Sequence, residues 1–239
     1  PKAAPAAATN ASATAPAASK TAQDVRQLLT LFGVVGDGFC PDYSVLDFLN
    51  LLDHARPEPE SPSNPTQPDR DRVFRLRKRI VEWMKADEQT RWRQNCKLRD
   101  TDIDEYLASE EYRNGTYKSL NENAYGNSKT LTATAVNLGV DIVSLDRTKL
   151  DNPDRLCFYE HTGKESFVTP ADVVQRINEP TAMPLVVIVF NGVTEKNGAP
   201  TPGGHYASGR LKDAVKQRQP QWTAPAWLDA DPNAGAGSD

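Results

Sequence analysis

Hydrophobic residues recur every three or four positions in several segments of this chain, which is the period of one face of an α-helix. The segments with this spacing are residues 22–32, 45–52, 69–84, 103–107, 131–138 and 173–177. The last of them follows Thr169 and Pro170, a cap residue and a proline that both favour a helix start. The pattern therefore predicts amphipathic helices that pack one face against a core.

Apolar runs of a different kind predict a small β-sheet. Residues 140–145 and 156–159 are short and apolar, and Leu185–Phe190 (LVVIVF) is apolar throughout. An unbroken run of this kind is typical of a strand that is covered on both faces. His205–Ser208 alternates and is predicted to return beside it, after a polar loop rich in glycine and proline over residues 191–204. We expect an α+β (α/β) fold with a small central β-sheet flanked by helices.

Composition separates one folded domain from two polar ends. Residues 1–20 are nearly all Ala, Pro, Thr, Ser and Asn, and residues 228–239 are mostly Asp, Ala, Gly and Pro. Such segments lack the apolar surface that offsets the entropy of ordering, so we expect a disordered linker and a disordered tail. The folded domain is predicted over residues 21–227. Because the chain starts at Pro1 without a methionine, we expect it to be a fragment of a longer protein.

Charge and cysteine content argue against several classes of protein. Among 239 residues, 28 basic and 32 acidic side chains give a net charge of −4, which indicates neither a nucleic-acid nor a membrane partner for the whole molecule. The longest apolar run, Leu185–Phe190, is far too short to span a bilayer. Cys40, Cys96 and Cys157 form no CxxC pair, so we expect no metal site and a reducing compartment such as the cytoplasm.

One predicted helix has a strongly basic face. Between Arg70 and Arg99 the chain holds many arginines and lysines, which suits a nucleic acid or an acidic partner. Acidic residues are interleaved with them, and mixed charge is the usual pattern of a solvated helix face. Nucleic-acid binding is therefore the less favoured interpretation of this segment.

Cys40 stands where a helix is predicted to begin. Gly36-Asp37-Gly38 allows a sharp turn before it, and Pro41 directly after it favours the first turn of a helix. Free backbone N–H groups and the helix dipole at such a position stabilise a thiolate, and a neighbouring amide can form an oxyanion hole. Cys40 is thus either a catalytic nucleophile or a small buried apolar residue.

His205 is the favoured base for such a nucleophile. It lies between a glycine-rich loop and a strand beside the buried LVVIVF strand, where an imidazole is held rigidly and still reaches solvent. A neutral imidazole there can accept the thiol proton near pH 7. His54 follows the cysteine helix too closely to fold back onto its start, and His161 lies in a polar turn.

Three blocks of the sequence resemble, in order, those of the OTU (ovarian tumour) family of cysteine peptidases, most of which are deubiquitinases. Asp37-Gly38-Phe39-Cys40 is similar to the family's Asp-Gly-x-Cys loop, and His205-Tyr206 is similar to its C-terminal His-Tyr motif. Between them, Tyr125-Gly126 with the apolar positions of residues 131–143 resembles its aromatic-glycine stretch, helix and strand. The resemblance covers residues 34–210 and implies a papain-like OTU fold, with a helical insertion at about residues 56–123.

The resemblance also implies a chemistry. Cys40 would be the nucleophile and His205 the general base of a thiol-dependent deubiquitinase, which hydrolyses peptide and isopeptide bonds at the ubiquitin C-terminus without a cofactor. Asp37 would shape the cysteine loop and its oxyanion hole. The residues that would line the substrate path are Gly38, Phe39, Gly204 and Tyr206.

Ubiquitin, polyubiquitin or a ubiquitin-like protein is the partner that the resemblance implies. We expect a monomer that acts in the cytoplasm, or in a host cytosol if the chain is a bacterial effector or a viral domain. The acidic residues 100–111 would suit the arginines of the ubiquitin tail.

The sequence departs from the family pattern beside both motifs. Phe39 and Pro41 flank the cysteine, where the family has a polar residue before it and a large apolar residue after it. The residue two after the histidine, often an Asn or Asp that orients the imidazole, is Ala207, and Ser208 should face away on an alternating strand. A third catalytic residue must come from elsewhere or is missing. The alternative is therefore a catalytically impaired OTU-like module that binds ubiquitin.

Overall fold

The computed structural model describes most of the predicted domain. The described residues are 25, 27–36, 38–58, 60–115, 126–146, 156–179, 183–196, 199–216 and 220–230. For residues 191–196, 199–204 and 214–215 the description is limited to the backbone. Asp37, Tyr125 and the predicted linker at residues 1–20 lie outside the described residues.

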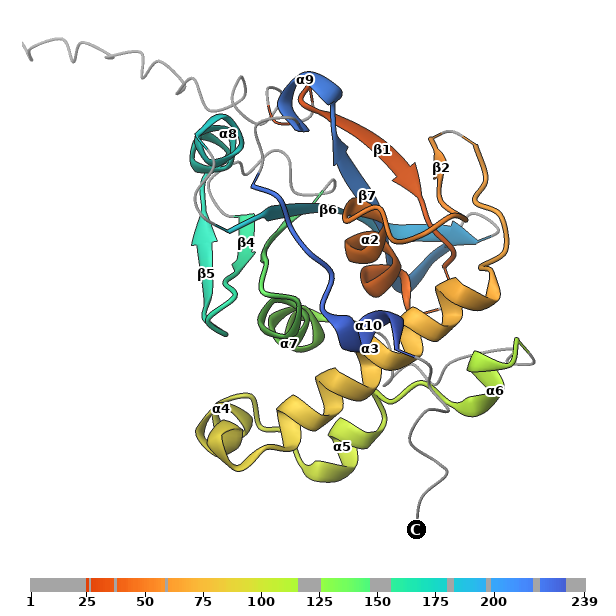
Figure 1. Ribbon diagram of the computed structural model, residues 1–239, viewed down its shortest axis with the longest axis vertical. Coiled ribbons are helices and arrows are strands. Elements are labelled where there is room, and N and C mark those ends of the chain that lie inside the picture. Colours follow the sequence, from red (N-terminus) through yellow and green to blue (C-terminus); the bar gives the residue numbers. More distant parts are fainter. Residues whose placement is uncertain are drawn as a thin grey trace, which may run out of the picture.

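A mixed β-sheet runs through the described part of the chain in the strand order β2-β1-β7-β6-β3-β4-β5 (Figure 1). Its strands are β1 (Leu29–Gly33), β2 (Arg56–Pro57), β3 (Asp141–Asp146), β4 (Leu156–Tyr159), β5 (Glu165–Val168), β6 (Leu185–Lys196) and β7 (Ala199–Leu211). β3 and β6 are parallel, and the other neighbouring strands are antiparallel. The predictions of β3, β4, the apolar half of β6 and its pairing with the strand at His205 are confirmed.

Helices cover the sheet and extend beyond it. They are α2 (Cys40–Phe48), α3 (Gln67–Lys85), α4 (Thr90–Asn95), α5 (Asp100–Asp104), α6 (Glu110–Arg113), α7 (Ser128–Leu138), α8 (Pro170–Asn178), α9 (Asp213–Lys216) and α10 (Ala226–Asp229), with a 3₁₀ turn, η1, at Asp87–Gln89. The predicted cap of α8 is confirmed, because the Thr169 side chain accepts a hydrogen bond from the Asp172 amide. Gly139 ends α7 in the left-handed conformation that favours glycine.

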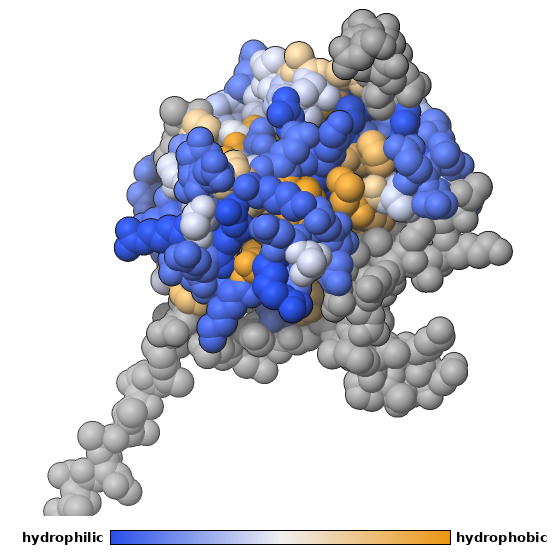
Figure 2. Space-filling model, turned by 90° about the horizontal axis from the view of Figure 1, so that it is seen from below, coloured by the Kyte–Doolittle hydropathy of each residue, from blue (hydrophilic) through white to orange (hydrophobic). Residues whose placement is uncertain are grey.

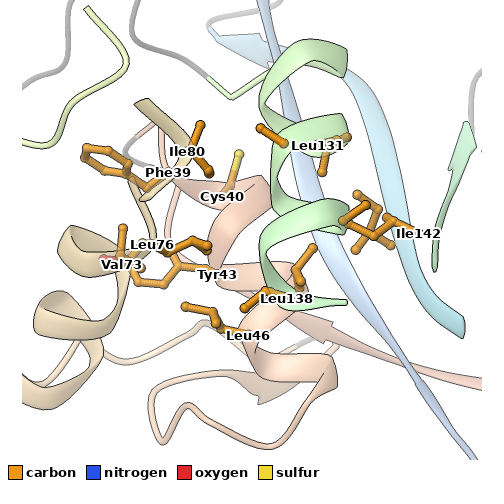
Figure 3. Packing of buried hydrophobic residues seen from close by; sticks show 14 of the residues in the cluster. Phe39, Cys40, Tyr43, Leu46, Val73, Leu76, Ile80, Leu131, Leu138 and Ile142 are labelled. Atoms are coloured by element: carbon orange, nitrogen blue, oxygen red, sulfur yellow. The ribbon is translucent and has the colours of Figure 1, made fainter. Parts of the chain in front are cut away.

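The two faces of the sheet bury different apolar clusters. Ile142 on one face lies in one cluster with Leu46 of α2, Leu76 of α3 and Leu131 of α7 (Figure 3). This cluster, which also includes Ile188 of β6, is called the α2 cluster. The opposite face of the sheet packs against Val173 and Ile177 of α8 in a second cluster, called the α8 cluster. Because the chain combines this largely antiparallel sheet with separate helices on both faces, it is of the α+β class.

The prediction of a helix over residues 22–32 is wrong for the second half of that segment. Leu29–Gly33 is strand β1, which pairs with β7. Leu29 belongs to the α8 cluster, whereas Phe32 packs against the α2 cluster. The same apolar residues satisfy a helix period and a strand alternation, and the hydrogen bonds available on the neighbouring strand select the strand.

The prediction of a loop over residues 191–204 is also wrong. The backbone continues β6 to Lys196 and starts β7 at Ala199, and Val193 pairs with Gly204 across the hairpin. Backbone groups supply this pairing, so a polar sequence does not prevent it. Strands β2 and β5 were not predicted, because each is short and borders polar or proline-rich residues.

Candidate active site

Cys40 is the first residue of α2, as the sequence predicted. Gly38 has a φ of 94°, so it supplies the left-handed turn before the helix. The Ser44 hydroxyl donates a 2.7 Å hydrogen bond to the Cys40 carbonyl inside the first turn. Cys40 is only 6% exposed and belongs to the α2 cluster, within which Figure 3 shows it. The thiol therefore sits at the positive end of a nine-residue helix, with little access from solvent.

A buried ion pair between α3 and α2 supports the cysteine loop, which is the segment of residues 36–40. The Phe39 side chain is fully buried, and its ring centroid lies 4.2 Å from that of Tyr112. The Arg77 guanidinium lies 5.0 Å from the Phe39 ring centroid, and its Nε donates a 2.8 Å hydrogen bond to the Asp42 carboxylate. Burial raises the pKa of Asp42, and the charge of Arg77 opposes this rise. Phe39, which the resemblance placed along the substrate path, thus has its side chain in the core.

The glycine before α7 closes over the same loop. The Gly126 amide donates a 3.2 Å hydrogen bond to the Gly38 carbonyl. A methyl group at position 126 would lie 2.5 Å from Cγ of Pro41. Only glycine therefore permits this approach, and the middle block of the resemblance contacts the first.

His205 contacts the cysteine loop from β7. A methyl group on Gly36 would lie 3.2 Å from the imidazole Nδ1, so the ring packs directly against the loop backbone. Burial lowers the pKa of His205, while the Glu58 carboxylate and a hydrogen bond to the backbone of Val34 act in the opposite direction. The net effect favours the neutral imidazole, which is the form that accepts a proton.

Tyr206, the residue after His205, interacts electrostatically with Cys40. Burial raises the pKa of the Tyr206 hydroxyl, and the nearby thiol of Cys40 adds to this rise. Tyr206 is half-buried, and its ring centroid lies 5.1 Å from that of Phe190. Gly204, the remaining residue placed along the substrate path, lies opposite Val193 in the hairpin.

The polar groups that act on the His205 imidazole are not an Asn or Asp two residues further along the chain. Ala207 is fully buried and paired with Gly33 and Val189, so it offers the ring no polar group. The Val34 carbonyl and the Glu58 carboxylate are the polar groups that influence His205. Sequence reasoning missed both, because a backbone carbonyl has no sequence signal and Glu58 lies in a proline-rich segment that was predicted to be a loop.

A scan of the sequence against protein-family models gave no match, and a search of curated proteins found no sequence similar enough to assign one.

The other two histidines have structural partners. His54 is fully buried, and its Nδ1 lies 3.1 Å from Asp69 at the start of α3. His161 is partly exposed, and its Nδ1 lies 2.8 Å from Asp141, which also pairs with Arg176. Within the described residues, no group of three His, Cys, Asp or Glu side chains is arranged to hold a metal ion.

The basic face of α3 makes many contacts within the chain. Arg77 is buried as described, Arg72 pairs with Asp229, and Arg75 donates a hydrogen bond to the Leu228 carbonyl. Figure 2, which views the side of the molecule where α3, α4 and α5 lie in Figure 1, shows a mainly hydrophilic surface with separate hydrophobic spots. These contacts leave fewer cations for a nucleic acid than the sequence suggests. None of the described helices has the length and apolar content needed to cross a membrane.

Proposed function

We propose that this domain is a thiol hydrolase that cleaves peptide or isopeptide bonds at the C-terminus of ubiquitin or a ubiquitin-like protein. The observation that supports it is the meeting of two elements at one glycine loop. Cys40 starts α2 two residues after Gly38, and the His205 imidazole of β7 packs on Gly36 of the same loop. A thiol at a helix N-terminus and a neutral imidazole that contacts the same loop are the two groups that an activated cysteine nucleophile requires.

The proposed reaction has two stages. Sγ of Cys40 attacks the carbonyl carbon of the C-terminal glycine as His205 accepts the thiol proton, and backbone N–H groups at the start of α2 stabilise the oxyanion. The C–N bond breaks, and the protonated His205 delivers its proton to the departing lysine amine. Water, deprotonated by His205, then attacks the thioester, so that the acid is released and the thiol is restored.

The burial of Cys40 favours a substrate with a slender end. Because only 6% of the surface of Cys40 is exposed, the thiol is accessible only to a chain of small cross-section. The ubiquitin tail ends in two glycines, which have no side chains to clash with the half-buried Tyr206 near the thiol. The resemblance to the OTU family points to the same substrate class.

The test is reaction with a ubiquitin whose C-terminal carboxyl bears a thiol-reactive group. We expect the wild-type domain to form a covalent adduct that is lost in Cys40→Ala and strongly slowed in His205→Ala. Cys96→Ala and His161→Ala are the matched controls, because they remove the same residue types from other places in the fold and should leave the adduct unchanged.

Two outcomes would refute the proposal that this domain is a hydrolase with Cys40 as its nucleophile. Adduct formation that persists in Cys40→Ala would assign the nucleophile elsewhere. Absence of an adduct together with measurable binding of unmodified ubiquitin would indicate a binding module in place of an enzyme.

A further inference from the structure

A cavity of about 570 Å³ lies at the opposite end of α2 from Cys40. Its walls come from β1, the end of α2, the start of β6, the end of β7, α9 and the chain after α9. This volume falls within the range of small-molecule sites in proteins, which is about 300–1,000 Å³. None of the residues placed in the candidate active site lines it.

The inner wall of the cavity is aromatic and held in place. Phe32, Phe48 and Trp222 line it, together with the buried Leu185 and Leu211. The indole Nε1 of Trp222 donates a 2.9 Å hydrogen bond to a backbone carbonyl of α7, which fixes the ring. Flat rings of this kind offer stacking partners to a flat aromatic ligand.

The mouth of the cavity is cationic. Lys212 and Lys216 are exposed and line it, with one acidic side chain, Asp213, between them. The Lys216 ammonium lies 3.2 Å from the Asn50 side-chain oxygen, which holds it at the rim. An anion at the mouth would therefore meet more positive than negative charge.

An ion pair connects the two elements that form the proposed active site. Arg210 of β7 lines the cavity, and its Nε donates a 2.9 Å hydrogen bond to the fully buried carboxylate of Asp47 in α2. Its guanidinium also lies 3.9 Å from the Phe32 ring centroid. The cavity thus has a rigid base formed by α2 and β7 together, and it is preformed rather than assembled by a ligand.

We infer that this cavity binds a small aromatic anion, with its flat apolar body between Phe48 and Trp222 and its negative group at Lys212 and Lys216. The inference does not depend on the proposed hydrolase, because the residues of the cavity and those of the active site are different.

The test uses 8-anilinonaphthalene-1-sulfonate, which has an aromatic body and one sulfonate, and N-phenyl-1-naphthylamine, which has the same body without the charge. Binding of each to the full chain is measured by isothermal titration calorimetry at low salt. The variants are Thr30→Phe, which fills the cavity from an exposed position on β1, and Lys216→Glu, which reverses a charge at the rim. Lys78→Glu reverses an exposed lysine on α3 and is the matched control.

We expect the sulfonate to bind wild type at one site, about tenfold or more weakly to Thr30→Phe because the volume is occupied, and about threefold to tenfold more weakly to Lys216→Glu. Lys78→Glu should match wild type. The proposed site would be refuted if the sulfonate showed no saturable binding to wild type. It would also be refuted if the sulfonate bound Thr30→Phe as tightly as wild type while the melting temperature of the variant was unchanged. The inference that the ligand is an anion would be refuted if wild type bound the uncharged compound with equal affinity. An unchanged affinity of Lys216→Glu for the sulfonate would refute it as well.

Discussion

The substitution Arg77→Met tests whether the buried ion pair between Arg77 and Asp42 stabilises the cysteine loop. Arg77 is fully buried and pairs with Asp42, which is 2% exposed, so Arg77→Met leaves a carboxylate buried without its counter-charge. Breaking a buried pair in this way costs about 3–5 kcal/mol. A domain of this size has a free energy of unfolding of about 5–15 kcal/mol, so the loss is a large fraction of the total. It corresponds to a fall in melting temperature of about 6–20 °C.

The assay is urea unfolding of Arg77→Met beside Lys78→Met, which changes the neighbouring exposed residue on the same helix. The double variant Asp42→Leu with Arg77→Met removes both charges and should recover most of the lost stability, because apolar residues of similar volume often replace a buried ion pair without loss. The adduct with the ubiquitin probe should also form more slowly in Arg77→Met, because Phe39 loses the guanidinium that packs on its ring.

The pH dependence of the same variant has a defined sign. Burial already raises the pKa of Asp42, and loss of Arg77 removes the charge that opposes this rise. A carboxyl whose pKa is higher in the folded than in the unfolded state destabilises the fold above the folded-state pKa, and the penalty disappears as the pH falls through it. Arg77→Met should therefore regain stability relative to Lys78→Met as the pH falls from 7 towards about 4. A loss below about 1 kcal/mol at pH 7, or no recovery in the double variant, would refute the reasoning.

Three further predictions concern the loop, the base and the sheet. Gly126→Ala should lose about 1–3 kcal/mol in urea unfolding, because its methyl group would lie 2.5 Å from the proline ring after the cysteine. Gly33→Ala has no such neighbour within 3.7 Å and is the control, so equal losses would contradict the close approach. Glu58→Gln should lower the pKa of His205 further in an NMR titration, and an unchanged value would show that the carboxylate does not act on the ring. Ser208→Ala should unfold at the same or a slightly higher urea concentration, because the buried hydroxyl has no hydrogen-bond partner among the described residues, and a loss above about 1 kcal/mol would reveal one.

Local sequence predicted the elements whose signals are also local. Pro41 after a glycine turn predicted the start of α2 at Cys40, and Thr169 with Pro170 predicted the start of α8. LVVIVF predicted a buried strand, since a strand covered on both faces needs apolar side chains at every position. Each signal lies within a few residues of the feature that it determines.

The candidate site was predicted only in part. Cys40 and His205 were chosen from the sequence, and the structure places His205 against the loop of Cys40 at Gly36. The Val34 carbonyl and Glu58 were not chosen, because their relation to His205 arises from the pairing of β2 with β1 and of β1 with β7. A backbone group has no residue type to recognise, and a single glutamate in a polar segment resembles any surface carboxylate.

Tertiary structure alone decided the outcome where one sequence pattern fits two environments. Residues 29–33 satisfy the spacing of a helix, yet hydrogen bonds to β7 make them a strand. Arg77 resembles its solvated neighbours on a basic helix, but the fold brings Asp42, 35 positions away, to its guanidinium and removes both from water. The sequence by itself determined most of the segments that bury apolar surface, and the starts of the helices that carry a proline or cap signal. Which charges are buried, and which strand lies beside which, depends on contacts between distant residues, whose energies no local pattern contains.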